Sequence, residues 1–267
     1  MARRMGCSMA DARLRTDFEG PVAILTLDRP EKLNALDQAM IAGIEDFVIA
    51  AERNRDIRVA IITGAGEKAF SAGGDIAAWA GLDPVTFMRD WIRNGHRVFD
   101  RLARLRQPLI ACLNGHAFGG GLELAATADL IVMEAHGRIG LPETGLAMVP
   151  GWSGTQRLVR RFGSRIVKRM ALGGEMFGAE DALALGLVDK VVPKGEGLVA
   201  AKALATAIAA RGPVAVQVTK QLINAAEGEE EAAAIESVAG ALAAFTEDLK
   251  EGAASFREKR APRFEDC

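Results

Sequence analysis

Residues 109–126 read LIACLNGHAFGGGLELAA, a run that begins apolar, passes through a glycine-rich stretch and ends in helix-forming residues. The first five residues are typical of a buried strand, and the last five are typical of a helix. Three glycines at the helix start leave backbone N–H groups exposed at the positive end of the helix dipole. This pattern favours either a site for an anion or oxyanion, or close packing of the helix against a strand.

The rest of the chain alternates between short strand-like and longer helix-like segments. Helices are predicted over residues 36–51 and 84–105, where apolar residues recur at helical spacing. Alternation of this kind predicts an α/β fold. The predicted strands cover residues 22–27, 59–63, 109–113, 130–133 and, more weakly, 187–192.

After Pro193 the chain becomes rich in alanine and is predicted to be helical. Gly212-Pro213 interrupts this region, and the proline suits the first turn of a new helix. A further helix is predicted to begin near residues 229–231. Its apolar stripe, which fits packing either on the core or on another subunit, consists of Ile235, Val238, Leu242, Phe245 and Leu249.

Composition excludes several classes of function. The 267 residues carry 33 Lys+Arg and 35 Asp+Glu, a formal net charge of −2, which predicts no general nucleic-acid surface. The three cysteines are too few and too scattered for a disulfide framework, which indicates a reducing, cytoplasmic location. Neither the cysteines nor the three histidines have metal-ligand spacing, so no metal site is predicted. No apolar run reaches the roughly 18 residues of a membrane span.

A second glycine cluster and two glutamates add possible chemistry. Ser71-Ala72-Gly73-Gly74-Asp75 precedes a helical stretch, Glu123 lies just inside the helix after the first cluster, and Glu143 follows an extended segment. Both glutamates have apolar neighbours, which disfavour the charged form and raise a carboxyl pKa toward the range useful for acid–base catalysis. The same residues also fit helix-end or surface charges. Spacing alone leaves open whether the two glycine clusters meet.

Taken in order, these segments resemble the crotonase superfamily, the enoyl-CoA hydratase/isomerase family. The similarity covers nearly the whole chain beyond residue 14. It is carried by the motifs at residues 22–36, 68–76, 114–125, 141–143, 150–158 and 256–260.

The resemblance implies a crotonase-like ββα spiral core over residues 14–197. Residues 198–267 would form a C-terminal helical region that helps to assemble homotrimers or homohexamers, and residues 1–13 a disordered extension. The implied substrates are acyl-CoA thioesters, with coenzyme A as part of the substrate and no separate cofactor.

The resemblance also implies a set of site residues. The backbone amides of Gly74 and Gly120 match the family's oxyanion hole, and Glu123 and Glu143 match the two glutamates of its hydratases. Glu143 would then donate the proton to C2, while Glu123 would orient and deprotonate the attacking water. The expected substrate- and CoA-binding residues are Lys32, Leu33, Ala35, Ala72, Gly73, Asp75, Ile76, Gly119, Pro142, Gly151, Trp152 and Lys259.

Two positions depart from the family pattern. Ala77 stands where many relatives carry a lysine that reaches toward the CoA phosphates. Either Lys32, or Lys259 of a neighbouring subunit, takes over that contact, or the affinity is lower. Trp152 stands where relatives usually have a small residue, so its ring either narrows the acyl pocket or packs away from it.

Three functions follow from the resemblance. The first is hydration of the 2,3 double bond of an enoyl-CoA thioester, which the intact glutamate pair and the absence of tyrosine favour. The second is another reaction of the family, such as isomerisation, dehydration of a 3-hydroxyacyl-CoA or thioester hydrolysis. The third is binding without turnover by a protein that has kept the fold.

Overall fold

The computed structural model describes residues 13–265. Nearly all of the predicted N-terminal extension therefore lies outside the described residues. The chain divides into two compact units between Gln217 and Val218. The boundary expected after residue 197 falls at the start of helix α9 (Gly197–Ala209), whose alanines pack on the strands of the first unit.

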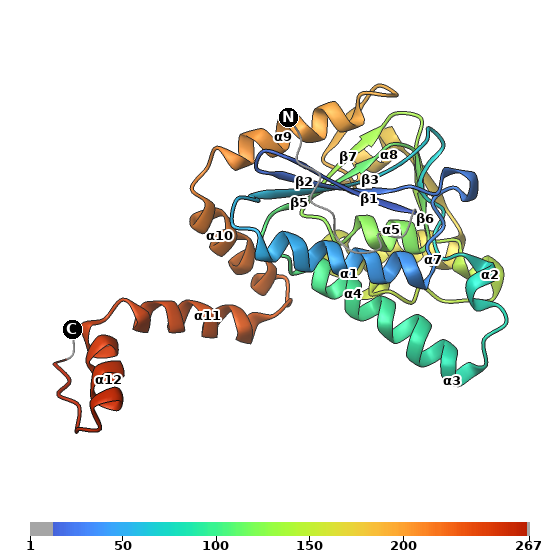
Figure 1. Cartoon of the computed structure of the whole chain (residues 1–267). Coiled ribbons are helices and arrows are strands. Elements are labelled where there is room, and N and C mark those ends of the chain that lie inside the picture. Colours follow the sequence, from blue (N-terminus) through green and yellow to red (C-terminus); the bar gives the residue numbers. More distant parts are fainter. Residues whose placement is uncertain (1–12, 266–267) are drawn as a thin grey trace. The chain divides into compact units, whose positions relative to one another are not determined.

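The first unit is built on a six-stranded sheet with the strand order β1-β2-β3-β5-β7-β10 (Figure 1). All neighbouring strands run parallel except β1, which is antiparallel to β2. The four stronger strand predictions are confirmed, and the weaker one at 187–192 is reduced to β10. The strands are β1 (Leu14–Glu19), β2 (Val22–Leu27), β3 (Val59–Gly64), β5 (Leu109–Leu113), β7 (Leu130–Glu134) and β10 (Lys190–Val192).

This sheet separates two apolar cores, because successive strand residues point to opposite faces. Leu25 and Leu27 join the larger core, together with α1 (Gln38–Arg53) and α4 (Asn94–Ala103). Val22 and Ile24 join the smaller core beneath α9. Figure 1 shows α9 over one face and α1, α4 and α5 over the other. Burial on both faces explains why these strands are almost continuously apolar.

A second, smaller sheet positions the site. It contains β4 (Ala69–Ser71), β6 (His116–Phe118), β8 (Arg138–Gly140) and β9 (Met176–Gly178) in that order. The first three strands are parallel, so their carboxyl ends meet at one edge. The pairs β3–β4, β5–β6 and β7–β8 are each followed by helix, which confirms the ββα core. The sequence did not predict this sheet, because its strands have only three residues each.

The segment predicted as one helix over residues 84–105 is helical in three parts. It consists of α3 (Pro84–Thr86), a π-helical turn η2 (Phe87–Arg93) and α4. Its π-helical part carries the buried Trp91. The other helices of this unit are η1 (Pro30–Lys32), α1, α2 (Ile76–Trp79), α5 (Gly120–Ala125), η3 (Glu143–Leu146), α6 (Gly154–Phe162), α7 (Ser164–Gly173), α8 (Ala179–Ala184) and α9.

The remaining helices are α10 (Pro213–Ala226), which spans the division, and α11 (Glu231–Ala244) and α12 (Glu247–Glu258) in the second unit. The predicted starts at Pro213 and near Glu231 are confirmed. The predicted stripe does not lie on one helix, because Thr246 caps α12 by accepting a hydrogen bond from the Leu249 amide. All five stripe residues are exposed, from 42% for Val238 to 87% for Phe245.

Within residues 13–265, no single helix has the length and apolar character needed to cross a membrane. The bent pair α9 and α10 meets that test of length and composition when the two helices are taken together.

Candidate active site

The segments that follow β4, β6 and β8 enclose a cavity of about 120 Å³. Ala72 to Gly74 follow β4, Gly119 and Gly120 follow β6, and Pro142 and Glu143 follow β8. Glu123 of α5, helix α2, the turn η2 and residues between 146 and 152 supply the rest of the wall. The cavity thus forms where three parallel strands end, a common place for ligand sites in α/β proteins.

The two glycine clusters meet at this cavity. A Cβ at Gly73 would lie 3.2 Å from the amide nitrogen of Gly120, and a Cβ at Gly120 would lie 3.4 Å from the amide nitrogen of Gly74. Gly73, with φ +100°, and Gly119, with φ +52°, adopt backbone conformations that other residues rarely adopt. The glycines are therefore needed both for the conformation of the two loops and for their close approach.

The amides of Gly74 and Gly120 are not used by the backbone pairing around them. The Leu36 amide donates to the carbonyl of Gly73, and the Asp75 amide donates to the carbonyl of Leu36, each at 2.7 Å. In such a parallel bridge the N–H of the central residue, here Gly74, faces away from the partner strand. Gly120 is the first residue of α5, where an N–H has no acceptor within its own helix.

Glu123 lies on the first turn of α5 and is only 2% exposed. Its Oε1 accepts hydrogen bonds from the backbone amides of Trp152 and Gly154, both at 2.8 Å. Burial raises the pKa of Glu123, and these backbone donors oppose that shift. A Cβ at Gly154 would lie 2.5 Å from Oε1, so only glycine leaves room for the carboxylate.

Glu143 begins η3 and faces the same cavity with a different set of surroundings. Both of its carboxylate oxygens are buried, and neither has a hydrogen-bond partner within residues 13–265. Burial, followed by the negative charge of Glu123, raises the pKa of Glu143 to about 7. A Cβ at Gly119 would lie 2.8 Å from its Oε1, which places this carboxylate against the second glycine loop.

The segment that holds Glu123 is itself tied to α4 and η2. The Trp152 indole donates from Nε1 to the carbonyl of Trp91 at 3.0 Å, and its ring packs 5.3 Å from that of Phe99. Ser153 has φ +71°, and its hydroxyl donates to Asp100 at 2.8 Å. Trp152 therefore belongs to the core and also lines the cavity, so it does not pack away from the site.

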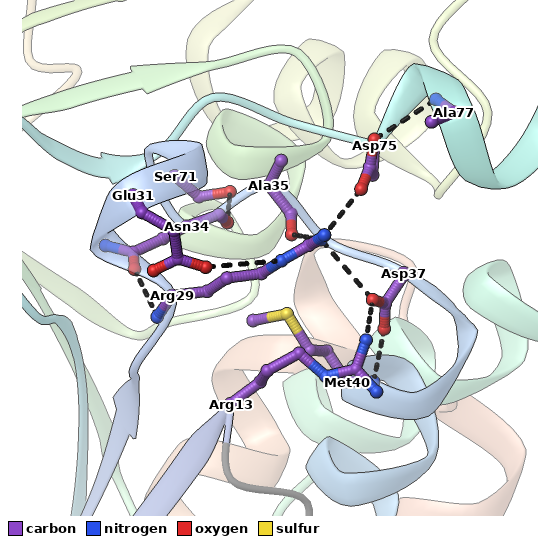
Figure 2. A network of polar contacts seen from close by, with 10 residues as sticks. All are labelled: Arg13, Arg29, Glu31, Asn34, Ala35, Asp37, Met40, Ser71, Asp75 and Ala77. Carbon is purple, nitrogen blue, oxygen red and sulfur yellow. Dashed lines mark hydrogen bonds and ion pairs between the residues drawn. The ribbon is translucent and has the colours of Figure 1, made fainter.

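Arg29 binds Asp75, the residue that follows the other glycine loop (Figure 2). Its guanidinium pairs with Asp75 at 2.8 Å and with Asp37 at 3.3 Å, and it donates to the carbonyl of Ala35 at 3.1 Å. Asp75 also caps α2 by accepting a hydrogen bond from the Ala77 amide. Burial raises the pKa of Asp75, but Arg29 and the cap outweigh it and leave the pKa below its usual value. Motif reasoning assigned no role to Arg29.

The structure brings most of the predicted site residues together. Lys32, Leu33, Ala35 and Asp75 do not line the cavity but lie beside its glycine loop, where the Ala72 amide donates to the carbonyl of Leu33 at 2.9 Å. Lys259 belongs to the second unit and ends α12. The predicted residues that line the cavity are Ala72, Gly73, Gly74, Ile76, Gly119, Gly120, Glu123, Pro142, Glu143, Gly151 and Trp152.

Sequence reasoning missed the apolar walls of the cavity. Trp91 and Ile92 come from η2, Trp79 from α2, and Leu146, Met148 and Val149 from the segment after Glu143. The only signal from Trp91 was its helical spacing, which indicates a core position, and it is indeed buried. No motif marks the other five.

Comparison with known sequences identifies the family of this chain. The family profile for enoyl-CoA hydratase/isomerase matches residues 17–267. Over 244 residues the chain is 38% identical to a short-chain-enoyl-CoA hydratase of Clostridium acetobutylicum, covering 91% of this chain and 93% of that protein. Over 260 residues it is 36% identical to a crotonyl-CoA hydratase of Syntrophomonas wolfei, covering 96% and 99% of the two chains.

Solved structures of the same family also match this chain. DspI of Pseudomonas aeruginosa matches with a TM-score of 0.83 at 32% identity, covering 98% of this chain and all of that one. An enoyl-CoA hydratase of Bacillus anthracis matches with a TM-score of 0.78 at 33% identity, covering 94% and 98%. The resemblance drawn from the motifs is thus confirmed. This chain belongs to the enoyl-CoA hydratase/isomerase family of the crotonase superfamily.

Proposed function

We propose that this chain is a hydro-lyase, an enoyl-CoA hydratase that adds water across the 2,3 double bond of an enoyl-CoA thioester. One observation carries the proposal: two carboxyl groups in opposite environments share a cavity with two glycine amides that the backbone pairing leaves unused. Relatives named as enoyl-CoA hydratases at 36–38% identity over most of the chain support it.

In this proposal the amides of Gly74 and Gly120 hold the thioester oxygen. Addition of water to the double bond builds negative charge on that oxygen, as in an enolate. Two N–H donors fixed in place stabilise the charge without reorganisation, and one such donor is typically worth about 10²–10³ in rate. The ion pair between Arg29 and Asp75 supports this role, because it immobilises the residue next to Gly74.

The glutamates divide the proton transfers. Glu123 carries the negative charge of the resting pair, because its Oε1 accepts two backbone hydrogen bonds while Glu143 accepts none within residues 13–265. Glu123 then orients the water and takes its proton as the oxygen attacks C3. Glu143, with a pKa of about 7, delivers a proton to C2. Because the two groups interact, they titrate as a pair.

The purified protein tests this assignment with crotonyl-CoA. The expected result is loss of the conjugated enoyl absorbance and formation of the 3-hydroxyacyl thioester. A 3-enoyl-CoA offered in parallel reports isomerisation instead of hydration. If neither thioester reacts while acyl-CoA still binds, the chain is a binding protein of the same fold and the proposal is wrong.

We propose that the pantetheine and phosphates of coenzyme A lie along Lys32, Leu33 and Ala35, next to the loop of Gly73 and Gly74. Lys32 is exposed and lies close enough to lower the pKa of Asp75. The reaction invokes no cofactor besides the coenzyme A of the substrate. The cytoplasmic location also stays a proposal, and fractionation of cells that express the chain tests it.

We further propose that the chain assembles into a homotrimer or homohexamer through its C-terminal helices. Exposed apolar side chains on the second unit support this, with Leu242 71%, Phe245 87% and Phe256 86% exposed. Lys259 of a neighbouring subunit would then approach the CoA phosphates. Light scattering tests the assembly, and a monomer at micromolar concentration would contradict it. Leu242→Ser with Phe245→Ser should shift the mass toward the monomer.

A further inference from the structure

The cavity ends in a wall of aromatic rings. Trp91 is 5% exposed and Trp152 is 3% exposed, whereas Ile76, Leu146 and Val149 on the same cavity are 49%, 56% and 67% exposed. The first two residues therefore close the deep end, and the last three form the rim. A Cβ at Gly120 would lie 2.7 Å from Cζ3 of Trp152, so this ring lies directly against the proposed oxyanion loop.

The ring of Trp152 is fixed in that position. A Cβ at Gly95 of α4 would lie 2.3 Å from its Nε1, which means that the indole fills the space a side chain would otherwise take. Its Nε1 donates to the carbonyl of Trp91, and the two rings lie 5.1 Å apart. The wall cannot move back without breaking this hydrogen bond or displacing α4.

The charged side chains of the cavity also restrict which acyl groups can bind there. Among the described residues that line it, the charged side chains are Glu123 and Glu143, with no arginine or lysine beside them. An acyl group that ends in a carboxylate would be buried there without a cation and near two other carboxyl groups, which is unfavourable.

We infer that Trp152 limits the acyl group to a short, uncharged chain, with the indole standing where the chain beyond C4 would extend. This inference rests on the proposed function, because it places the reacting carbons between Glu123 and Glu143. Relatives of similar identity are named as hydratases of short-chain enoyl-CoA, crotonyl-CoA, 2,3-dehydroadipyl-CoA and benzylidenesuccinyl-CoA, so membership of the family does not by itself fix the acyl group.

The test measures kcat/KM for trans-2-enoyl-CoA substrates of four, six and ten carbons, and for one that ends in a carboxylate. The wild-type protein should prefer the four-carbon over the ten-carbon substrate by about 100-fold, and a neutral over a carboxylate-ended substrate of equal length by about as much. Trp152→Leu should raise the ten-to-four-carbon ratio at least about 10-fold. The backbone amide that holds Glu123 is unchanged in this variant.

Trp152→Phe is the matched control. It keeps most of the bulk of the ring, so the chain-length profile should stay close to that of the wild type. It loses the hydrogen bond to the carbonyl of Trp91, which separates the effect of bulk from the effect of that bond. Thermal melting of both variants checks folding. A wild-type protein that hydrates the ten-carbon substrate as well as crotonyl-CoA overturns the inference even if Trp152→Leu fails to fold.

Binding of butyryl-CoA and decanoyl-CoA by calorimetry separates this inference from the proposed function. If no thioester is hydrated but the wild type still binds butyryl-CoA more tightly and Trp152→Leu reverses the order, the proposed reaction fails and the limit on chain length stands. If Trp152→Leu leaves both the kinetic and the binding profiles unchanged, the acyl chain leaves along the rim of Ile76, Leu146 and Val149. Trp152 then has no role in specificity.

Discussion

Glu123 and Glu143 line one cavity, yet the chain surrounds them in opposite ways. Glu123 is held by the amides of Trp152 and Gly154, and the segment that supplies them is tied to α4 and η2. Glu143 is buried without a partner for either oxygen within residues 13–265. A buried polar group without a partner is costly and rare, so its presence in a cavity points to function. Burial raises the pKa of both carboxyl groups, but the backbone amides of Trp152 and Gly154 oppose this shift at Glu123.

Removing either carboxyl group gives the largest expected effect. Glu123→Gln and Glu143→Gln should each lower the turnover of crotonyl-CoA by about 10²–10⁴-fold, because each loses a positioned acid or base. Turnover is followed by the loss of enoyl absorbance, and circular dichroism checks the fold. If both variants keep more than about a tenth of wild-type turnover, the contrast between the two walls has no catalytic meaning.

The amide of Gly120, on the same wall as Glu123, has the next largest expected effect. Gly120 is the first residue of α5, where proline is compatible with a helix, so Gly120→Pro deletes the N–H. The new Cβ would meet the Trp152 ring at 2.7 Å in any variant. Gly120→Ala is therefore the matched control, since it introduces the same contact and keeps the N–H.

We expect Gly120→Pro to turn over about 10²–10³-fold more slowly than Gly120→Ala, with a much smaller difference in CoA affinity. Thermal melting has to show both variants folded. Equal rates for the two variants would mean that the amide is no oxyanion donor and that the glycine serves only the close approach of the ring.

Much of the wall around Glu123 could be predicted from sequence, because its parts are local. The strand at residues 109–113, the three glycines and the helix that carries Glu123 follow one another along the chain, and each obeys a propensity or a spacing rule. The family motifs then placed Gly74, Glu143 and Gly151, all of which line the cavity. The apolar neighbours of Glu123 left open whether it is buried or a helix-end charge, and the structure shows it buried.

The rest depends on contacts that no local rule carries. The approach of Gly73 to Gly120 follows from the pairing of β4 with β6, two strands of three residues each. Trp91 lines the cavity beside Trp152, whose indole donates to the Trp91 carbonyl from 61 residues further along the chain. The ion pair between Arg29 and Asp75 likewise joins residues that are far apart in the sequence. The break at Phe245-Thr246 was missed because the apolar spacing continues across it.

The pH dependence of the free energy of unfolding tests the surroundings of Glu143. The pKa of Glu143 is about 7 in the folded chain against 4.5 as the ordinary value. Between these values the folded state binds more protons than the unfolded state, so the free energy of unfolding falls as pH rises. A shift of this size contributes about 3 kcal/mol to the free energy of unfolding. This contribution is fully present below the lower pKa and is lost above the higher one.

Glu143→Gln removes this pH dependence. The free energy of unfolding of the variant minus that of the wild type should increase by about 3 kcal/mol as the pH rises from 4 to 8. The variant also loses activity. Urea unfolding across that range measures the difference. Parallel stability curves for the two proteins would show that Glu143 titrates normally and that its wall does not favour a proton.

The smallest effect concerns Ser153, which lies between the two residues whose amides hold Glu123. Its φ of +71° is strained for a residue with a Cβ, and its hydroxyl donates to Asp100 at 2.8 Å. Ser153→Ala loses the bond to a charged group and keeps the strain, so it should lower the free energy of unfolding by about 2 kcal/mol. Ser153→Gly also loses the bond but relieves the strain, and should stay about 1 kcal/mol more stable than Ser153→Ala. Urea unfolding of the two variants under identical conditions measures that gap. Equal stability of the two variants would show that the turn is not strained. If both variants are as stable as the wild type, the hydrogen bond from Ser153 to Asp100 does not stabilise the segment that holds Glu123.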